Sequence, residues 1–148
     1  MSTYIQIYYH IVFSTKNRIP CLLNAQHEDL FRYIWGILKN NDCHLYRINA
    51  VLDHIHLFTR LHPGKSLSDL VKTIKSSSTI WIKKHNVFKE FSHWQEGYGA
   101  FTHSNKEKGR IIKYIKNQEN NHKTISFKDE LQALLDEAGI KYDERYLI

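Results

Sequence analysis

The sequence predicts an α+β fold built on an antiparallel sheet, and two patterns of apolar residues carry this prediction. Three segments alternate apolar and polar residues as half-buried strands do: residues 4–13, 44–53 and 54–61. Three other segments carry apolar residues at the three- and four-residue spacing of amphipathic helices: residues 24–41, 66–85 and 105–120. The order of these segments along the chain then predicts how they pair.

The first strand is expected over residues 4–13, YIQIYYHIVF. Its alternation places five residues on one face: Ile5, Ile7, Tyr9, Ile11 and Phe13. A polar loop that ends at Pro20 follows, and Asn24 is a suitable N-cap for a helix that runs to about Asn41. The apolar residues of this helix form one stripe: Leu30, Ile34, Ile37 and Leu38.

The second and third strands are expected to pair through a tight turn near Asp53. The second strand places four residues on one face: Tyr46, Ile48, Ala50 and Leu52. The third directs the following residues to the core: Ile55, Leu57, Thr59 and Leu61. Because successive side chains of a strand point to opposite faces, the other face carries His54, His56, Phe58 and Arg60. Whether helices cover that face is left open.

The second half of the chain completes the pattern. Ser66 or Ser68 begins a helix to about His85, and the segment HWQEGYGAFTHS suits a bent or edge strand because of its two glycines. Ser104 and Glu107 form a capping box that opens the next helix. A last amphipathic helix over residues 127–138 ends at Gly139. The order β-α-β-β-α-β predicts a ferredoxin-like (split βαβ) antiparallel sheet, with helices on one face plus C-terminal helices.

The length and composition are those of one globular domain over residues 1–148. No apolar run approaches the length of a membrane span, and the N-terminus has no basic region before an apolar stretch. We therefore expect no membrane association and a cytoplasmic location.

Positive charge is concentrated in the middle of the chain. The net charge is +6, and residues 65–89 and 105–123 carry local charges of +5 and +4, whereas the chain from residue 128 onward carries −3. Such a basic centre indicates a polyanionic partner, most commonly nucleic acid. The alternative is that the lysines only solubilise helix faces.

Two pairs of residues are candidates for chemistry. His54 and His56 share one strand face, although two imidazoles do not complete a divalent metal site. Tyr114 and Gln118 are four residues apart on a basic helix and therefore lie on the same side of it. Taken alone, each pair is more often structural than functional.

Together and in this order, the motifs resemble those of the single-tyrosine insertion-sequence transposases of the HUH superfamily, in their compact, hairpin-recognising form. The segments that carry the resemblance span nearly the whole chain: YHIVFSTKNR, VLDHIHLF, WQEGYGAFTHS, IIKYIKNQ and FKDELQALLDEAGIKYDERYL.

The resemblance implies a metal-dependent tyrosine transposase that cuts and rejoins single-stranded DNA. It implies that His54, His56 and Gln118 hold Mg²⁺ or Mn²⁺, ions that accept mixed nitrogen and oxygen ligands. It also implies that Tyr114 is the nucleophile that forms a 5′-phosphotyrosine and frees a 3′-OH. No nucleotide cofactor is needed, because a later 3′-OH can reverse the step.

The implied partners are single-stranded DNA with imperfect hairpins and a second copy of the chain. In the expected homodimer, the tyrosine helix of one subunit serves the histidine pair of the other. Candidate DNA contacts are Lys16, Arg18, Arg110 and Lys113. Trp94 and Tyr98 either stack on bases or belong to the core, and His10 and His103 receive no role.

Three alternatives stay open. A non-catalytic nucleic-acid-binding module would need only the basic face, although the RNA-recognition motif is matched only in part by GYGAF. A metal-dependent hydrolase would need more carboxylates near the histidine pair than the sequence offers there. A domesticated relative that processes chromosomal repeats would use the same chemistry as a mobile-element transposase.

Overall fold

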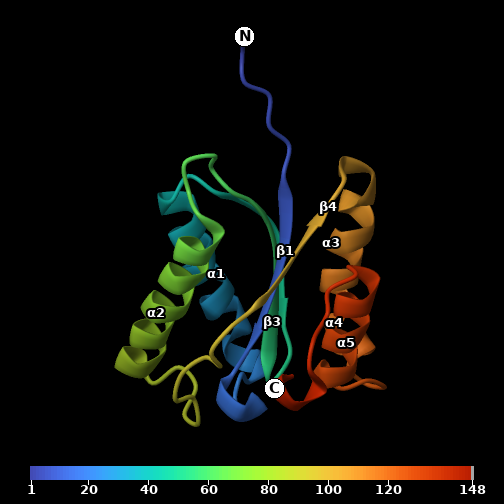
Figure 1. Cartoon of the computed structure of the whole chain (residues 1–148). Helices are drawn as coiled ribbons and strands as arrows, with labels where there is room; N and C mark the ends of the chain where they lie inside the picture. Colours follow the sequence, from blue (N-terminus) through green and yellow to red (C-terminus); the bar gives the residue numbers. More distant parts are fainter. Residues whose placement is uncertain (148) are drawn as a thin grey trace.

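Helices cover both faces of a four-stranded antiparallel sheet in the computed structural model, which describes residues 1–147 (Figure 1). The strand order is β2-β3-β1-β4. The strands are β1 (Tyr8–Ser14), β2 (His44–Ala50), β3 (His54–Arg60) and β4 (Gly99–His103). This arrangement confirms the predicted ferredoxin-like α+β fold. Residue 148 of the predicted domain lies outside the described residues.

The helices form two layers, one on each side of the sheet (Figure 1). One layer consists of α1 (His27–Asn40) and α2 (Leu67–His85), and the other of α3 (Lys108–Lys116), α4 (Gln118–Asn121) and α5 (Phe127–Glu137). Single 3-10 turns occur at four places: Lys16–Arg18, Asn24–Gln26, Asn105–Glu107 and Glu144–Tyr146. The C-terminal helices therefore cover the sheet face that carries His54 and His56.

The larger core lies between the sheet and the layer of α1 and α2. Ile55 and Leu57 of β3 are completely buried there, as predicted, and they pack with Ile34 of α1 and Ile74 of α2. A smaller cluster on the opposite face joins Phe58 to the apolar residues of α3. Both faces of β3 are therefore buried, which is why this strand has only one exposed residue, Arg60.

The first strand is shorter than predicted, because β1 begins at Tyr8 rather than at residue 4. Tyr8 pairs with Arg60 on one side and with His103 on the other, and these are the last residues of β3 and β4. Residues before Tyr8 have no neighbouring strand, and their isoleucines are 43% and 45% exposed. The prediction of a strand over residues 4–7 is therefore wrong.

A β-bulge at Tyr46 contradicts the predicted face of the second strand. Leu45 pairs with Thr59 and Arg47 pairs with Phe58, so Tyr46 is an extra residue in β2. A bulge reverses the alternation of side chains. Tyr46 therefore packs against the ring of Phe58, with ring centroids 5.7 Å apart, on the face opposite Ile48. The predicted common face for Tyr46, Ile48 and Ala50 is wrong for Tyr46.

The predicted helix over residues 105–120 is divided. The capping box of Ser104 and Glu107 is present, and a 3-10 turn leads into α3. The backbone then leaves helical geometry at Asn117 (φ −94°, ψ 19°), and α4 begins at Gln118. Two other helix signals are confirmed: Ser66 caps α2, and Gly139 follows α5 with φ of +70°.

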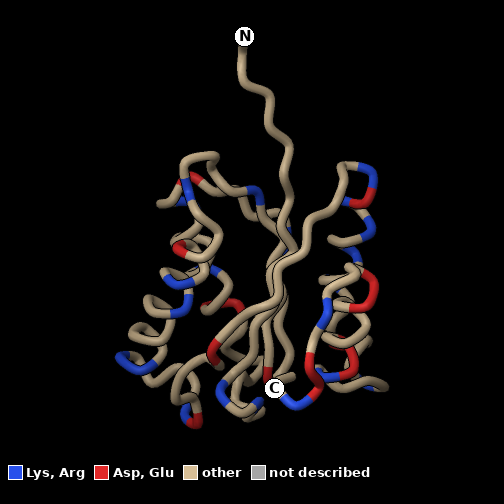
Figure 2. The backbone as a smooth tube through the Cα atoms, viewed as in Figure 1, with Lys and Arg blue, Asp and Glu red and all other residues tan. Residues whose placement is uncertain are grey.

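Lysines and arginines lie mainly on the two helical layers, and the strands between them carry few (Figure 2). No helix within residues 1–147 combines the length and the apolar character that a bilayer span requires.

Candidate metal centre and nucleophile

His54 and His56 lie side by side on the central strand β3 and are completely buried. Their strand neighbours on β1 are Ser14 and Val12, and the C-terminal helices cover this face of the sheet. The prediction that the two histidines share one face is confirmed. The face is not open to solvent, so any ligand between the histidines is enclosed by protein.

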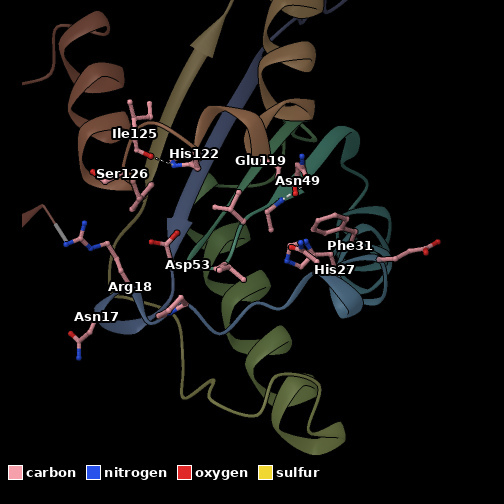
Figure 3. Close-up of a pocket in the computed structure, with 17 residues that line it drawn as sticks. Asn17, Arg18, His27, Phe31, Asn49, Asp53, Glu119, His122, Ile125 and Ser126 are labelled. Carbon is pink, nitrogen blue, oxygen red and sulfur yellow. Dashed lines mark hydrogen bonds between the residues drawn. The ribbon is translucent and has the colours of Figure 1, made fainter.

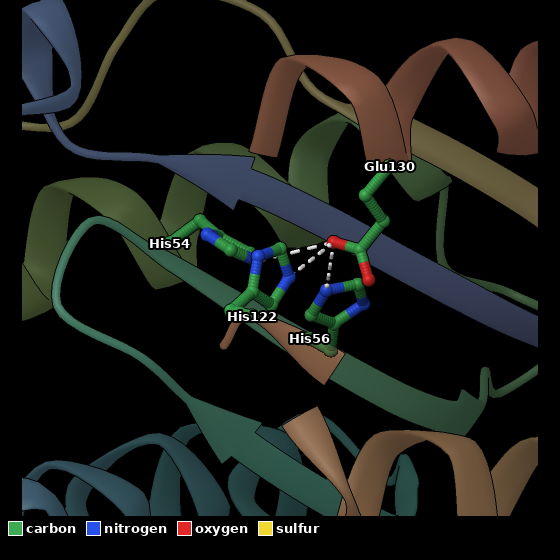
Figure 4. A group of neighbouring side chains, drawn as sticks. All are labelled: His54, His56, His122 and Glu130. Atoms are coloured by element: carbon green, nitrogen blue, oxygen red, sulfur yellow. Dashed lines mark hydrogen bonds and ion pairs between the residues drawn. The ribbon is translucent and has the colours of Figure 1, made fainter. Parts of the chain in front are cut away.

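Glu130 of α5 lies at the centre of the site (Figure 4). Its Oε1 is 3.0 Å from the Nε2 atoms of both His56 and His122 and 3.2 Å from His54 Nε2. Its other oxygen, Oε2, accepts hydrogen bonds from the Tyr114 hydroxyl and from Gln118 Nε2. One carboxylate therefore joins the histidines of β3 to the tyrosine of α3.

Local packing explains how α5 delivers Glu130 to this position. Ser126 caps the helix by accepting a hydrogen bond from Asp129 N, and Phe127 is buried with its ring stacked on His54 at a centroid distance of 4.2 Å. Glu130 follows Phe127 by three residues and therefore lies on the same buried side of α5. Its side chain is 1% exposed.

The buried carboxylate controls the electrostatics of the site. Burial raises the pKa of Glu130, but the adjacent imidazoles of His122, His54 and His56 outweigh burial and hold this pKa far below its usual value. For His54, burial lowers the pKa, but the hydrogen bond to Asp53 and the nearby carboxylate of Glu130 outweigh burial and raise the pKa. Glu130 is therefore a carboxylate in a positively polarised pocket.

Tyr114 is not activated by its protein neighbours alone. Burial raises the pKa of Tyr114, and the negative charge of Glu130 raises it further. The phenol therefore stays protonated at neutral pH and donates its hydrogen bond to Glu130. A nucleophilic role requires additional positive charge near the hydroxyl.

The side chains of the site fit a divalent cation. The ligand atoms of His54, His56, His122 and Glu130 all lie within 4.8 Å of one another. Among the residues that the structure describes, the buried atoms His54 Nε2 and Gln118 Oε1 have no hydrogen-bond partner. Buried polar atoms normally have one, so these two atoms indicate a missing partner. Imidazole nitrogens and side-chain oxygens are ligands of divalent metals.

The structure brings four of the sequence-predicted residues together, namely His54, His56, Tyr114 and Gln118. Sequence reasoning missed His122 and Glu130. A signal for both existed: His122 continues the four-residue spacing of Tyr114 and Gln118, and Glu130 is a charged residue on the apolar side of an amphipathic helix.

The predicted DNA contacts lie on two elements, the turn after β1 and helix α3. Lys16 and Arg18 belong to the turn after β1, and Arg110 and Lys113 are exposed on α3. Arg110 is paired with Glu107 at 2.8 Å, which partly neutralises it.

The two aromatic candidates divide between surface and core. Trp94 is 5% exposed and donates a hydrogen bond to Ser78 Oγ, so it belongs to the core. Tyr98 is 41% exposed, and its ring is accessible for stacking.

His10 and His103, which received no role from the sequence, have distinct surroundings. His10 is completely buried, and its Nε2 is 2.7 Å from His56 Nδ1. His103 lies 3.7 Å from Glu107 and does not contact the carboxylate of Glu130.

A pocket of about 930 Å³ opens beside the histidine cluster (Figure 3). Its wall includes Arg18, Asn49, Asp53 and His122. Asp53 and His122 both contact His54, which connects the pocket to the cluster. The pocket is thus an accessible space next to buried candidate ligands.

Comparison with known proteins gives a consistent result. The family described as "Transposase IS200 like" matches residues 3–118. A candidate transposase from Deinococcus radiodurans has 24% identity and a TM-score of 0.62, covering 80% of this chain and 95% of that one. A REP-associated tyrosine transposase bound to a REP hairpin has 20% identity and a TM-score of 0.63, covering 84% of this chain and 76% of that one. No curated protein matches significantly.

Proposed function

The chain belongs to the IS200-like transposase family, and from this premise we propose that it cuts and rejoins single-stranded DNA through a covalent bond to Tyr114. One observation carries the proposal: the Tyr114 hydroxyl and the imidazoles of His54 and His56 meet on a single buried carboxylate, that of Glu130. A nucleophile held next to candidate metal ligands is the arrangement that phosphodiester cleavage requires.

The reaction we propose is an in-line transesterification. Attack by the Tyr114 oxygen forms a bond to phosphorus and breaks the bond to the 3′ oxygen, which leaves as a hydroxyl with the proton that the phenol gives up. The DNA keeps a 5′-phosphotyrosine link, and a second 3′-OH can reverse the step. Glu130 orients the Tyr114 hydroxyl through the hydrogen bond to its Oε2.

The family resemblance assigns His54, His56 and Gln118 as ligands of Mg²⁺ or Mn²⁺. A bound cation would supply Lewis acidity to the scissile phosphate and positive charge next to Tyr114. This charge offsets the effect of Glu130 and burial, both of which raise the pKa of Tyr114. The orphaned Gln118 Oε1 and His54 Nε2 support a cation in this position.

The proposed substrate is single-stranded DNA that carries a hairpin. Support comes from the relative that is described as bound to a REP hairpin and from the pocket beside the cluster. In our proposal Arg18 in the pocket wall and Lys16, Arg110 and Lys113 elsewhere on the surface contact phosphates.

Tyr114 reaches the site of its own chain, because its ring centroid is 6.0 Å from that of His56. This distance supports a site that one chain can complete. The homodimer with exchanged tyrosine helices stays a prediction, and it requires α3 to leave this position in each subunit.

The convergence of Tyr114, Gln118 and the histidine pair argues against a purely binding module, which needs a basic face but no buried polar cluster. A hydrolase now has the carboxylate that the sequence lacked near the histidines, and its activity would not depend on the Tyr114 hydroxyl.

The test uses end-labelled single-stranded DNA with an imperfect hairpin, taken from the flanks of the gene. The protein is incubated with this DNA and Mg²⁺ or Mn²⁺ and compared on a denaturing gel with Tyr114→Phe and His56→Ala. We expect a metal-dependent covalent protein–DNA band that both variants lack. Cleavage that survives Tyr114→Phe would refute the nucleophile and favour hydrolysis.

A further inference from the structure

We propose that the cation site consists of three imidazoles and one carboxylate, from His54, His56, His122 and Glu130, and that it therefore selects transition-metal ions over Mg²⁺. The role of this cation in cleavage rests on the proposed function, whereas its ligands and selectivity can be measured without DNA.

The three imidazoles converge on one point. Their Nε2 atoms lie 3.0–3.2 Å from the same oxygen, Glu130 Oε1, although they come from β3 and from the turn after α4 (Figure 4). A cation needs its ligands at about 2.0–2.2 Å, so Glu130 Oε1 would have to withdraw from the point where the three Nε2 atoms meet and leave that point to the cation. The side chains of His54, His56 and Glu130 are at most 1% exposed, which shields the centre from water.

The outer nitrogens fix which ring atom faces the centre. His54 Nδ1 is 2.7 Å from the Asp53 carboxylate, and His122 Nδ1 is 2.9 Å from the Ile125 carbonyl. Both partners only accept hydrogen bonds, so each Nδ1 carries a proton. When such a ring is neutral, its Nε2 lone pair points at the centre.

His56 Nδ1 also has a hydrogen-bond partner, the imidazole of His10. His56 Nδ1 is 2.7 Å from His10 Nε2, which can accept its proton and leave the His56 Nε2 lone pair free. Second partners of this kind are a regular feature of histidines that bind metals, because they orient the ring and fix the tautomer. All three imidazoles of the cluster have one.

Without a cation, the polar atoms of the cluster are only partly satisfied. His56 and His122 can donate from Nε2 to Glu130 Oε1 only in the other tautomer or when the ring is protonated, and His54 Nε2 makes no hydrogen bond. A divalent cation converts each of these atoms into a ligand. The structure therefore contains preorganised groups that a cation satisfies together.

The ligand types determine the selectivity. Mg²⁺ prefers oxygen ligands and keeps several waters, whereas imidazole-rich sites favour later transition-metal ions such as Co²⁺ and Zn²⁺. In this assignment His122 and Glu130 replace Gln118, the third ligand that the family resemblance implies, and Gln118 Nε2 donates to Glu130 Oε2 at 3.0 Å. Together with the Tyr114 hydroxyl it positions the carboxylate, so that Glu130 links the cation to the nucleophile.

The first test is calorimetric titration of chelator-treated protein with Mg²⁺, Mn²⁺, Co²⁺ and Zn²⁺. We expect Co²⁺ and Zn²⁺ to bind at least about tenfold more tightly than Mg²⁺. His122→Ala and Glu130→Gln should each weaken Co²⁺ binding by about tenfold or more. The matched controls are His85→Ala, an exposed histidine, and Glu137→Gln, an exposed carboxylate on α5, and both should bind as the wild type does.

The second test needs no variant. In protein labelled with ¹⁵N-histidine, Zn²⁺ should shift the Nε2 resonances of three rings and leave their Nδ1 protons in place. Shifts at only two rings, equal affinity for Mg²⁺ and Co²⁺, or unchanged affinity in His122→Ala would each overturn the assignment.

Parallel adduct assays separate the two proposals. A covalent DNA adduct together with unchanged Co²⁺ binding in His122→Ala leaves the function in place and refutes this ligand set. Three shifted imidazoles without any adduct at Tyr114 support the ligand set and refute the function.

Discussion

Replacing His10 with phenylalanine should weaken cation binding although residue 10 does not touch the cation. His10 Nε2 is the partner of His56 Nδ1 at 2.7 Å, and the two rings are stacked with centroids 5.0 Å apart. His10 is completely buried, so no water replaces its nitrogen. Phenylalanine keeps a ring in this space and removes the acceptor.

The magnitude follows from the proton of His56. To bind a cation through Nε2, His56 must carry its proton on Nδ1, and His10→Phe leaves that buried donor without a partner. An unsatisfied buried donor costs about 1–3 kcal/mol, which corresponds to a loss of roughly 5- to 150-fold in cation affinity. Without a cation, His56 can move the proton to Nε2 and donate to Glu130, so the stability of the metal-free protein should change little.

The assay is titration with Co²⁺, together with thermal unfolding in the presence of a chelator. His103→Phe is the matched control, because it makes the same substitution next to His10, with ring centroids 6.1 Å apart, but leaves the bond between His10 and His56 intact. Wild-type Co²⁺ affinity in His10→Phe would refute the reasoning. An equal loss in His103→Phe would show that ring packing matters and the acceptor does not.

Four further predictions concern stability. Leu57→Ala removes a completely buried side chain and should lower the free energy of unfolding, measured in urea, by roughly 2–5 kcal/mol. Leu52 is 43% exposed, so Leu52→Ala should change this free energy little. Equal effects of the two substitutions would contradict the assignment of the core. Ser66→Ala removes the cap of α2 and should cost about 1 kcal/mol, seen as a fall of roughly 2–4 °C in melting temperature, and an unchanged value would argue against the cap. The Ser104 backbone and Arg110 lower the pKa of Glu107 to about 2. The ionised Glu107 therefore stabilises the fold fully above its usual pKa, and this stabilisation is lost as the pH falls from about 4.5 towards 2. The melting temperatures of wild type and Glu107→Gln should differ at neutral pH and converge at about pH 2–3. Mn²⁺ at about 100 times its Kd should raise the free energy of unfolding by about 2.7 kcal/mol, and a chelator should reverse this increase. If Mn²⁺ does not raise the free energy of unfolding, that result counts against a cation site.

The local patterns of the sequence determined the elements and their order. Strand alternation placed His54 and His56 on one face and Leu57 on the other, since the direction of a side chain in a strand depends only on its position. The capping box at Ser104 and the glycine after α5 were equally readable, because caps satisfy hydrogen bonds within a few residues. From these elements the ferredoxin-like fold follows by the rules of chain connection.

These local patterns do not predict the register in which the strands pair. The bulge at Tyr46 arises from how β2 pairs with β3, and it moves one aromatic ring to the other side of the sheet. The sequence of β2 alone does not contain its partner's positions, so its alternation was misread there. The prediction of a strand before Tyr8 was wrong for the same reason, because the two neighbouring strands end opposite Tyr8.

Only the tertiary structure decided which side chains meet in the candidate site. The spacing of Tyr114 and Gln118 predicted that they act together, yet α3 and α4 are separate at Asn117, and the two side chains meet because both bond Glu130. Glu130 is 74 residues from His56 in the chain. The packing of α5 on the sheet brings them within hydrogen-bond distance, and no local pattern encodes the position of one layer on another. The sequence therefore determined the histidine pair and the tyrosine, and the packing of the C-terminal helices decided which carboxylate and which third imidazole join them.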